Sequence, residues 1–81
     1  STKFTFELSS AANICIYIYT LGGKKIKKID CELLSNGFHS IEWNGMNQYN
    51  SEIANGVYIY KIITSNDKEK IDYIGRCAKL K

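Results

Sequence analysis

Apolar and polar residues alternate with a period of two in short blocks along this chain, and clusters of Gly, Asn and Ser separate the blocks. Successive side chains of a strand point to opposite faces, so such blocks predict strands with one buried face. Phe4, Phe6 and Leu8 share one face of the first predicted strand. Between residues 13 and 20, isoleucines alternate with Cys and Tyr, a content typical of a central strand.

The next segments are predicted to be strands joined by tight turns. Residues 21–24 contain two glycines and predict a hairpin turn before a third strand, over roughly residues 25–33. Residues 35–37 predict a second turn, followed by a strand in which His39, Ile41 and Trp43 share a face. Ile41 and Trp43 belong in a core, so we expect His39 to face inward or toward the rim.

The second half of the chain combines one long loop with two strands. Residues 44–55 are rich in Asn, Gly and Ser and predict a loop that turns back on itself. Gly56 then opens the most strand-like stretch, residues 57–64, and residues 65–68 predict another hairpin turn.

The last predicted strand changes the parity of its apolar residues. Ile71 and Tyr73 are odd-numbered, whereas Ala78 and Leu80 are even-numbered. One inserted residue flips every later side chain, so we expect a β-bulge at Gly75.

These elements predict the fold class. The chain has 81 residues, enough for one small domain over residues 1–81. No helical spacing is sustained, and turn signals recur about every ten residues. We therefore expect an all-β fold, an antiparallel immunoglobulin-like β-sandwich of six to seven short strands. No apolar run is long enough for a transmembrane segment, and no signal peptide is recognised.

Positive charge is modest but local. The formal net charge is +3, well short of the basic excess of a nucleic-acid binder, so we expect no nucleic-acid partner. Lysines gather in one cluster and near the end of the sequence: Lys24, Lys25, Lys27, Lys28, Lys79 and Lys81. A solvated turn and exposed strand face is the favoured interpretation of the cluster, and an anion-binding patch is the alternative.

The cysteines give no complete framework. Cys15, Cys31 and Cys77 are an odd number without a C-x-x-C pair, so neither a full disulfide scaffold nor a zinc knuckle fits. The favoured interpretation is three free thiols that act as small apolar residues. One bridge with one leftover thiol also fits, so the redox compartment stays open.

The sequence offers little for catalysis. His39 is the single histidine, and the carboxylates are scattered over turns and polar strand faces. No phosphate-cradling glycine loop or metal-ligand spacing occurs. Asn44, Asn47 and Asn50 resemble a calcium loop only superficially, since neutral amides supply too little negative charge. We expect no catalytic residues, no cofactor, no metal site and no enzyme activity.

Aromatic side chains are the remaining candidates. Tyr17 and Tyr19 lie opposite the isoleucine face, and Tyr58 and Tyr60 share a face with Ile62. A solvent-facing aromatic row would stack on sugar rings or dock a partner. The favoured interpretation is that most of these rings cover the core, because rings are the bulk apolar material of a small all-β domain.

Two motifs resemble the FlgD-like immunoglobulin domains. Residues 18–26 resemble their "I-Y-D-x-x-G-x-x-V" hairpin, and residues 43–60 resemble their "W-D-G-x-D-x-x-G-x-x-V-x-x-G-V-Y-x-Y" signature. The two ends of the chain also match such modules. The residues that carry the motifs, which we expect to be structural, are Gly23, Trp43, Gly45, Asn50, Gly56, Tyr58 and Tyr60.

Departures from the motifs are mild. Asn50 replaces a glycine, and asparagine tolerates left-handed geometry well. Thr20, Asn44 and Asn47 replace aspartates, which removes charge but keeps turn hydrogen bonding. Trp43 is expected to plug the sandwich where the long loop begins.

The resemblance implies a function in one of two settings. Such domains occur in the flagellar hook-capping protein and as C-terminal sorting domains read by the type IX secretion system. We expect the second: a non-catalytic C-terminal module of a larger protein, secreted or on the outer-membrane surface of a Gram-negative bacterium. Its partners would be secretion or attachment machinery, or anionic lipopolysaccharide, contacted through the six lysines named above. The alternatives are a structural spacer or hook-cap-like assembly domain that contacts neighbouring domains, and a carbohydrate-binding module.

Overall fold

The computed structural model describes residues 2–79, without the side chains of residues 2, 30 and 31. The described residues form six strands and no helix, and none of them therefore forms a helix able to cross a membrane. The strands are β1 (Thr2–Leu8), β2 (Ala12–Tyr19), β3 (Lys25–Leu34), β4 (Gly37–Trp43), β5 (Gly56–Ser65) and β6 (Lys70–Lys79).

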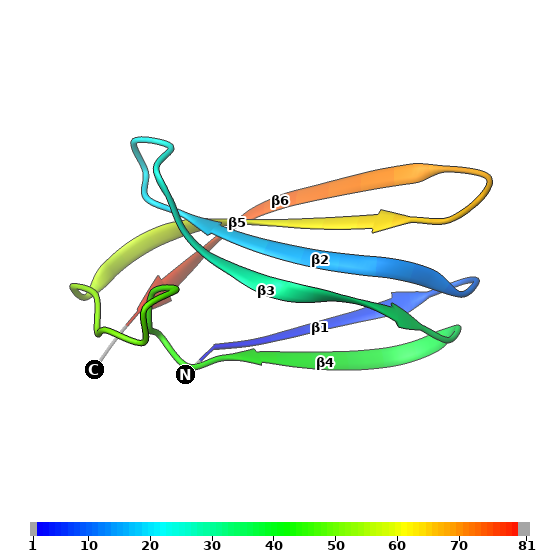
Figure 1. Cartoon of the computed structure of the whole chain (residues 1–81), viewed down its shortest axis with the longest axis horizontal. Helices are drawn as coiled ribbons and strands as arrows, with labels where there is room; N and C mark the ends of the chain where they lie inside the picture. Colours follow the sequence, from blue (N-terminus) through cyan, green and yellow to red (C-terminus); the bar gives the residue numbers. More distant parts are fainter. Residues whose placement is uncertain (1, 80–81) are drawn as a thin grey trace.

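The strands form two antiparallel sheets that pack face to face. One sheet has the order β3-β2-β5-β6, and the other pairs β1 with β4 (Figure 1). The predicted all-β immunoglobulin-like sandwich is confirmed, with six strands among the described residues. Figure 1 also shows that β1 begins and β6 ends at one end of the sandwich, beside the β2–β3 turn and the loop that follows β4.

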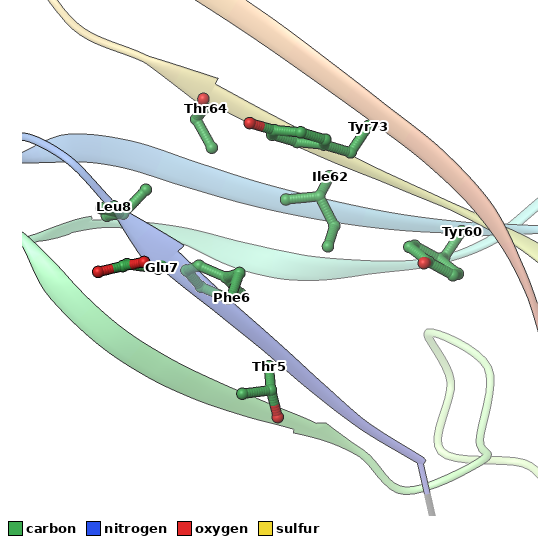
Figure 2. A pocket seen from close by; sticks show the side chains of 8 residues that line it. All are labelled: Thr5, Phe6, Glu7, Leu8, Tyr60, Ile62, Thr64 and Tyr73. Carbon is green, nitrogen blue, oxygen red and sulfur yellow. The ribbon is translucent and has the colours of Figure 1, made fainter.

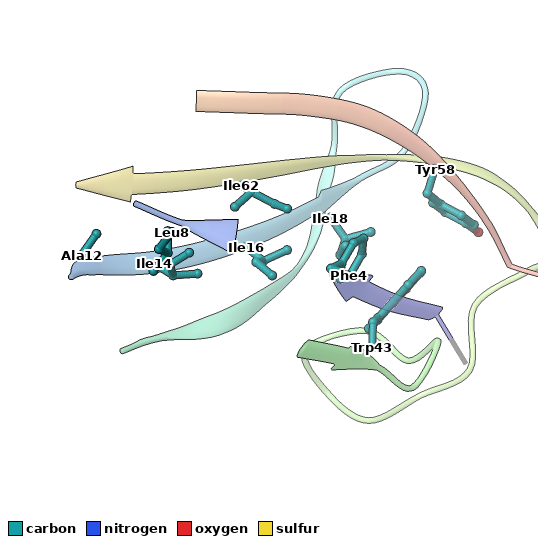
Figure 3. Packing of buried hydrophobic residues seen from close by; sticks show 9 residues of the cluster. All are labelled: Phe4, Leu8, Ala12, Ile14, Ile16, Ile18, Trp43, Tyr58 and Ile62. Atoms are coloured by element: carbon teal, nitrogen blue, oxygen red, sulfur yellow. The ribbon is translucent and has the colours of Figure 1, made fainter. Parts of the chain in front are cut away.

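The core lies between the two sheets and centres on β2. Ile14, Ile16 and Ile18 are 0% exposed, as expected for the inward face of a central strand. Burial of each such side chain contributes about 1.5–3 kcal/mol to stability. The remaining members of the core, shown in Figure 3, are Phe4, Leu8, Ala12, Trp43, Tyr58 and Ile62.

Glycine and asparagine make the turns, as the sequence predicts. In the β2–β3 turn, Gly23 has a φ of +95° and its N–H donates to the Thr20 carbonyl over 2.9 Å. The loop after β4 does turn back on itself, because Met46 and Glu52 form an isolated antiparallel bridge. His39 is half-buried at the rim, where its Nε2 donates to the Ser35 carbonyl over 2.6 Å.

The predicted bulge at Gly75 is wrong. Strands β5 and β6 pair without a register shift from Gly56 opposite Lys79 to Ser65 opposite Lys70. Cys77 and Lys79 therefore stay on the inward face, and Ala78 is exposed. The irregularities occur instead between β2 and β3, around Cys15 and at the step from Ile18 to Tyr19.

Gly75 serves a different purpose, because it leaves room for the Tyr60 ring. The two residues are cross-strand partners, and a Cβ added at Gly75 would lie 2.7 Å from Cε2 of Tyr60. Real Cβ atoms do not approach ring atoms so closely. The glycine thus lets Tyr60 lie flat across β6 and reach Phe4, whose ring centroid is 5.0 Å away.

Gly75→Ala is expected to lower the free energy of unfolding by about 1–3 kcal/mol, because the methyl group overpacks the site. The same change made in a Tyr60→Ala background should cost less, with a coupling of about 0.5–3 kcal/mol in a double-mutant cycle. Gly22→Ala is the matched control, since its Cβ would come no nearer than 3.8 Å to Thr20. Urea unfolding measures all four variants, and equal costs in both backgrounds would contradict the packing role.

Candidate functional site

The signature loop, residues 44–55, is anchored by Trp43. The indole is 1% exposed, and its Nε1–H donates to the Met46 carbonyl over 2.9 Å. Its ring meets Tyr58 edge-on with centroids 6.0 Å apart. The Tyr58 hydroxyl in turn donates to the Ala54 carbonyl over 2.6 Å, just before β5 starts at Gly56 with a φ of +156°. Both ends of the loop are therefore tied to the core.

Asparagines organise the interior of the loop. The Asn44 side-chain oxygen accepts the Met46 N–H over 3.0 Å, and that of Asn47 accepts the N–H groups of Tyr49 and Ser51. Asn50 has a φ of +61°, the left-handed geometry expected at a position where related domains carry glycine. These amides act as turn-forming acceptors.

Lys79 fastens the signature loop to β6. Its side chain is 12% exposed, and its Nζ donates to the Ile53 carbonyl over 2.8 Å and lies 3.7 Å from Glu52 Oε2. The alkyl stem passes over Gly45, where an added Cβ would lie 2.9 Å from Lys79 Cε. Gly45 also has a φ of +79°, so its backbone conformation favours glycine, and an added Cβ would force the Lys79 stem to shift.

This inward position corrects the sequence expectation for Lys79. The sequence pattern predicts Lys79 on the solvent-facing side of the last strand, as a partner contact. In the structure, its ammonium group is engaged within the domain. Long alkyl stems cover apolar surface while the charged head finds a partner, which is why a lysine fits an inward position. Lys81, the other predicted contact near the end of the sequence, lies outside the described residues.

The four hairpin lysines do not form one patch. Lys24 is exposed in the turn, where its N–H donates to Thr20 Oγ1 over 3.1 Å. Lys27 pairs with the buried Ile18, so it points toward the opening between β3 and β4. Lys25 and Lys28 lie on the outer face, with their Nζ atoms 5.4 and 5.9 Å from the centroid of the Tyr17 ring, and Lys28 also borders the opening between β3 and β4.

Two further cations join Lys25 and Lys28 on the outer face of the four-stranded sheet. Lys61 is the cross-strand partner of Tyr17. Arg76 pairs with Ile59, which is itself the cross-strand partner of Tyr19. We call this surface the basic face: Tyr17, Tyr19, Lys25, Lys28, Lys61 and Arg76. Sequence reasoning missed Lys61 and Arg76, because only the strand order brings them beside the hairpin lysines. Asp72 offsets part of the charge, 3.7 Å from Lys61.

The tyrosines divide between the two faces of the sheet. Tyr58 is buried and Tyr60 is half-buried, both facing inward, as the interpretation of rings as core material predicts. Tyr17 and Tyr19 face outward with centroids 6.3 Å apart. A continuous row of four rings therefore does not exist.

Two cysteines differ in state. Cys15 is disulfide-bonded, and the β2–β3 register sets residues 30–31 opposite it. The side chain of Cys31 lies outside the described part of the structure. Cys77 is a free, half-buried thiol, and burial raises its pKa. The favoured expectation of three free thiols is wrong, and the alternative of one bridge applies.

Within the described residues, no three His, Cys, Asp or Glu side chains gather as a metal site would need.

A hollow of about 260 Å³ opens between β1 and the inward face of β5 and β6 (Figure 2). It is lined mainly by apolar side chains, among them Phe6, Leu8, Tyr60, Ile62 and Tyr73. The sequence contains no signal for this hollow, since it depends on how far each sheet extends.

Comparisons with known proteins agree with this architecture. In structure, the chain is similar to FlgD from P. aeruginosa, with a TM-score of 0.78 and 19% identity over 94% of this chain and 60% of that one. It is also similar to dimeric latent PorU from Porphyromonas gingivalis, with a TM-score of 0.71 and 17% identity over 94% of this chain and 8% of that one. The chain thus spans less than two thirds of either protein. No curated protein matches it in sequence.

A family comparison covers most of the chain. The sequence model of the FlgD Ig-like domain matches residues 1–68, which include β1 to β5 and the whole signature loop. Strand β6 completes the four-stranded sheet beyond the matched range. This chain therefore belongs to the FlgD Ig-like domain family.

Proposed function

We propose that this domain is a type IX secretion sorting and surface-attachment module of a secreted or outer-membrane protein of a Gram-negative bacterium. Membership of the FlgD Ig-like family makes it a non-catalytic immunoglobulin-like domain. The finer role rests on the resemblance of its two motifs to sorting domains, on the basic face, on the disulfide of Cys15 and on the positions of the strand ends.

The basic face is the observation that carries the proposal. Two cross-strand rows place Lys28 and Lys61 beside Tyr17, and Lys25 and Arg76 in the row of Tyr19. A face of this kind attracts anions, such as the phosphorylated sugars of lipopolysaccharide or acidic surfaces of transport machinery. Lys25 and Lys28 already approach the Tyr17 ring, where a neutral sugar would stack. This arrangement favours an anionic partner over the neutral ligand of a carbohydrate-binding module.

The disulfide supports an extracytoplasmic location. Disulfides persist mainly in oxidising compartments, and Cys15 is disulfide-bonded. A small domain with a limited core gains most from such a link.

The positions of the strand ends bear on the alternative of a structural spacer. Because β1 begins and β6 ends at the same end of the sandwich (Figure 1), a chain that enters there also leaves there. An in-line spacer passes the chain from one end to the other. The arrangement therefore favours a module attached by one end, with the basic face free along its side.

A reporter fusion tests the proposal. The domain is fused behind a periplasmic reporter in a host with a type IX system, and the reporter is assayed in the periplasm, at the surface and in the medium. We expect the reporter at the surface or in the medium, and only when the host has a working type IX system. A reporter that stays in the periplasm would contradict the proposal.

A further inference from the structure

Strand β1 has one free backbone edge beside the hollow. It pairs with β4 along one edge, and no other described strand pairs with it. On the free side it faces the inward surface of β5 and β6 (Figure 2). Unpaired N–H and C=O groups along a strand edge are a template for a further strand.

The hollow beside this edge is apolar and incompletely covered. Tyr73 is 55% exposed although it faces inward opposite Ile62. Phe6 and Tyr60 are also only partly buried. The opposite opening, between β3 and β4, differs because Lys27, Glu32 and Glu42 line it. Charged side chains therefore line the opening on one side of the sandwich, and mainly apolar side chains line the hollow on the other.

The width of the two sheets explains the hollow. The larger sheet has four strands and the smaller has two, and neighbouring strands lie about 4.8 Å apart. Strand β6 comes close to β1 over part of its length, but its inward face is incompletely covered around Tyr73, which is 55% exposed. One extended strand beside β1 would continue the small sheet and cover Tyr73.

Charges mark the two ends of the free edge. Lys3 and Glu7 lie on the solvent face of β1, two residues to either side of Thr5. Arg76 lies near Lys3 and Glu69 lies near Glu7, whereas Glu42, the cross-strand partner of Lys3 on β4, offsets part of the positive charge at the Lys3 end. Within the described part of the chain, Lys3, Glu7, Glu69 and Arg76 form no ion pair.

We infer that this edge binds one extended strand of a partner protein, which pairs antiparallel with β1 and fills the hollow with alternate apolar side chains. On the solvent face, this strand carries an acidic residue opposite Lys3 and a basic residue opposite Glu7. A second copy of the domain fits less well, because its own four-stranded sheet would enter the same space. The inference does not depend on the proposed secretion role.

Short peptides test the inference on the intact domain. The probe is an end-blocked peptide with the sequence TKFTFEL, which when antiparallel to β1 sets its Lys opposite Glu7 and its Glu opposite Lys3. The control TEFTFKL has the same composition with the charges exchanged. Binding is followed by NMR of the labelled domain. We expect saturable shifts in β1, Tyr60, Ile62 and Tyr73.

The control peptide should bind about fivefold to tenfold more weakly, because two attractive cross-strand pairs become repulsive. Equal binding of the two peptides, or shifts confined to β3 and β4, would overturn the inference. The matched variants are Tyr73→Lys, which blocks the hollow, and Ile74→Lys, on the other face of β6, where Ile74 is 71% exposed. Only Tyr73→Lys should abolish binding. If the free domain dimerises and Tyr73→Lys abolishes the dimer, the edge binds a second copy of the domain. That result would overturn the inference of a partner strand.

Discussion

Trp43→Ala is expected to lower the free energy of unfolding by about 3–5 kcal/mol, because it removes a large, fully buried side chain. Trp43 is 1% exposed and joins β4, the signature loop and Tyr58. Its removal leaves a cavity and an unpaired Met46 carbonyl. A small domain has a total stability of about 5–15 kcal/mol, so the variant should be near its unfolding midpoint under mild conditions.

Urea unfolding followed by circular dichroism measures this effect. Trp43→Phe should cost less, because it keeps an aromatic ring and loses mainly the indole hydrogen bond to Met46. Tyr49→Ala is the control in the same loop, since Tyr49 is 78% exposed and should change stability by about 0.5 kcal/mol or less. If Trp43→Ala and Tyr49→Ala unfold at the same urea concentration, Trp43 does not anchor the loop.

Loss of the disulfide at Cys15 is the second large effect. Cys15→Ala should lower the free energy of unfolding by about 2–4 kcal/mol, because the cross-link restricts the unfolded chain. A reducing agent should lower the free energy of unfolding of the unmodified domain by the same amount. It should leave that of Cys15→Ala unchanged. A reduced domain as stable as the oxidised one would show that the link contributes nothing.

Cys77 supplies the control for that experiment. It is the free thiol of the described chain, so Cys77→Ala keeps the disulfide and should remain sensitive to reduction. Burial raises the pKa of Cys77, which keeps the thiol protonated at neutral pH. Because the thiolate is the attacking species in disulfide exchange, Cys77 should leave the bond of Cys15 intact in the folded domain.

Local patterns predicted most of the fold. The alternation of Ile14, Ile16 and Ile18 with polar or aromatic neighbours identified the central strand, because one buried face requires that period. Gly23 and Asn50 marked turns, because few residues adopt positive φ values at low cost. These features are visible in the sequence because each depends on neighbouring residues alone.

The last strand was misread for a physical reason. Ala78 and Leu80 suggested an inward face with even numbers, but Lys79 points inward and ends on the Ile53 carbonyl. A pattern of apolar and polar letters counts lysine as polar and ignores its apolar stem. Gly75 then suggested a bulge, although it makes room for the ring of Tyr60 across the sheet.

The candidate sites depended on contacts between distant residues. The lysine cluster was visible in the sequence, but irregular pairing of β3 sends Lys27 to one side and Lys25 and Lys28 to the other. Lys61 and Arg76 join the basic face only through the order β3-β2-β5-β6. The hollow beside β1 arises from the difference in width between the sheets, and no segment of the chain encodes it locally.

Under the proposed function, the basic face directs export, a claim that the amount of surface-exposed reporter in the fusion assay tests. The Lys25→Glu, Lys28→Glu double variant reverses two charges on this face. The matched control, Lys68→Glu with Lys70→Glu, reverses two exposed charges at the β5–β6 turn, at the opposite end of the sandwich (Figure 1). Both should fold and unfold like the original domain. We predict that the first loses export and the control keeps it, whereas equal export of the two variants would contradict the claim.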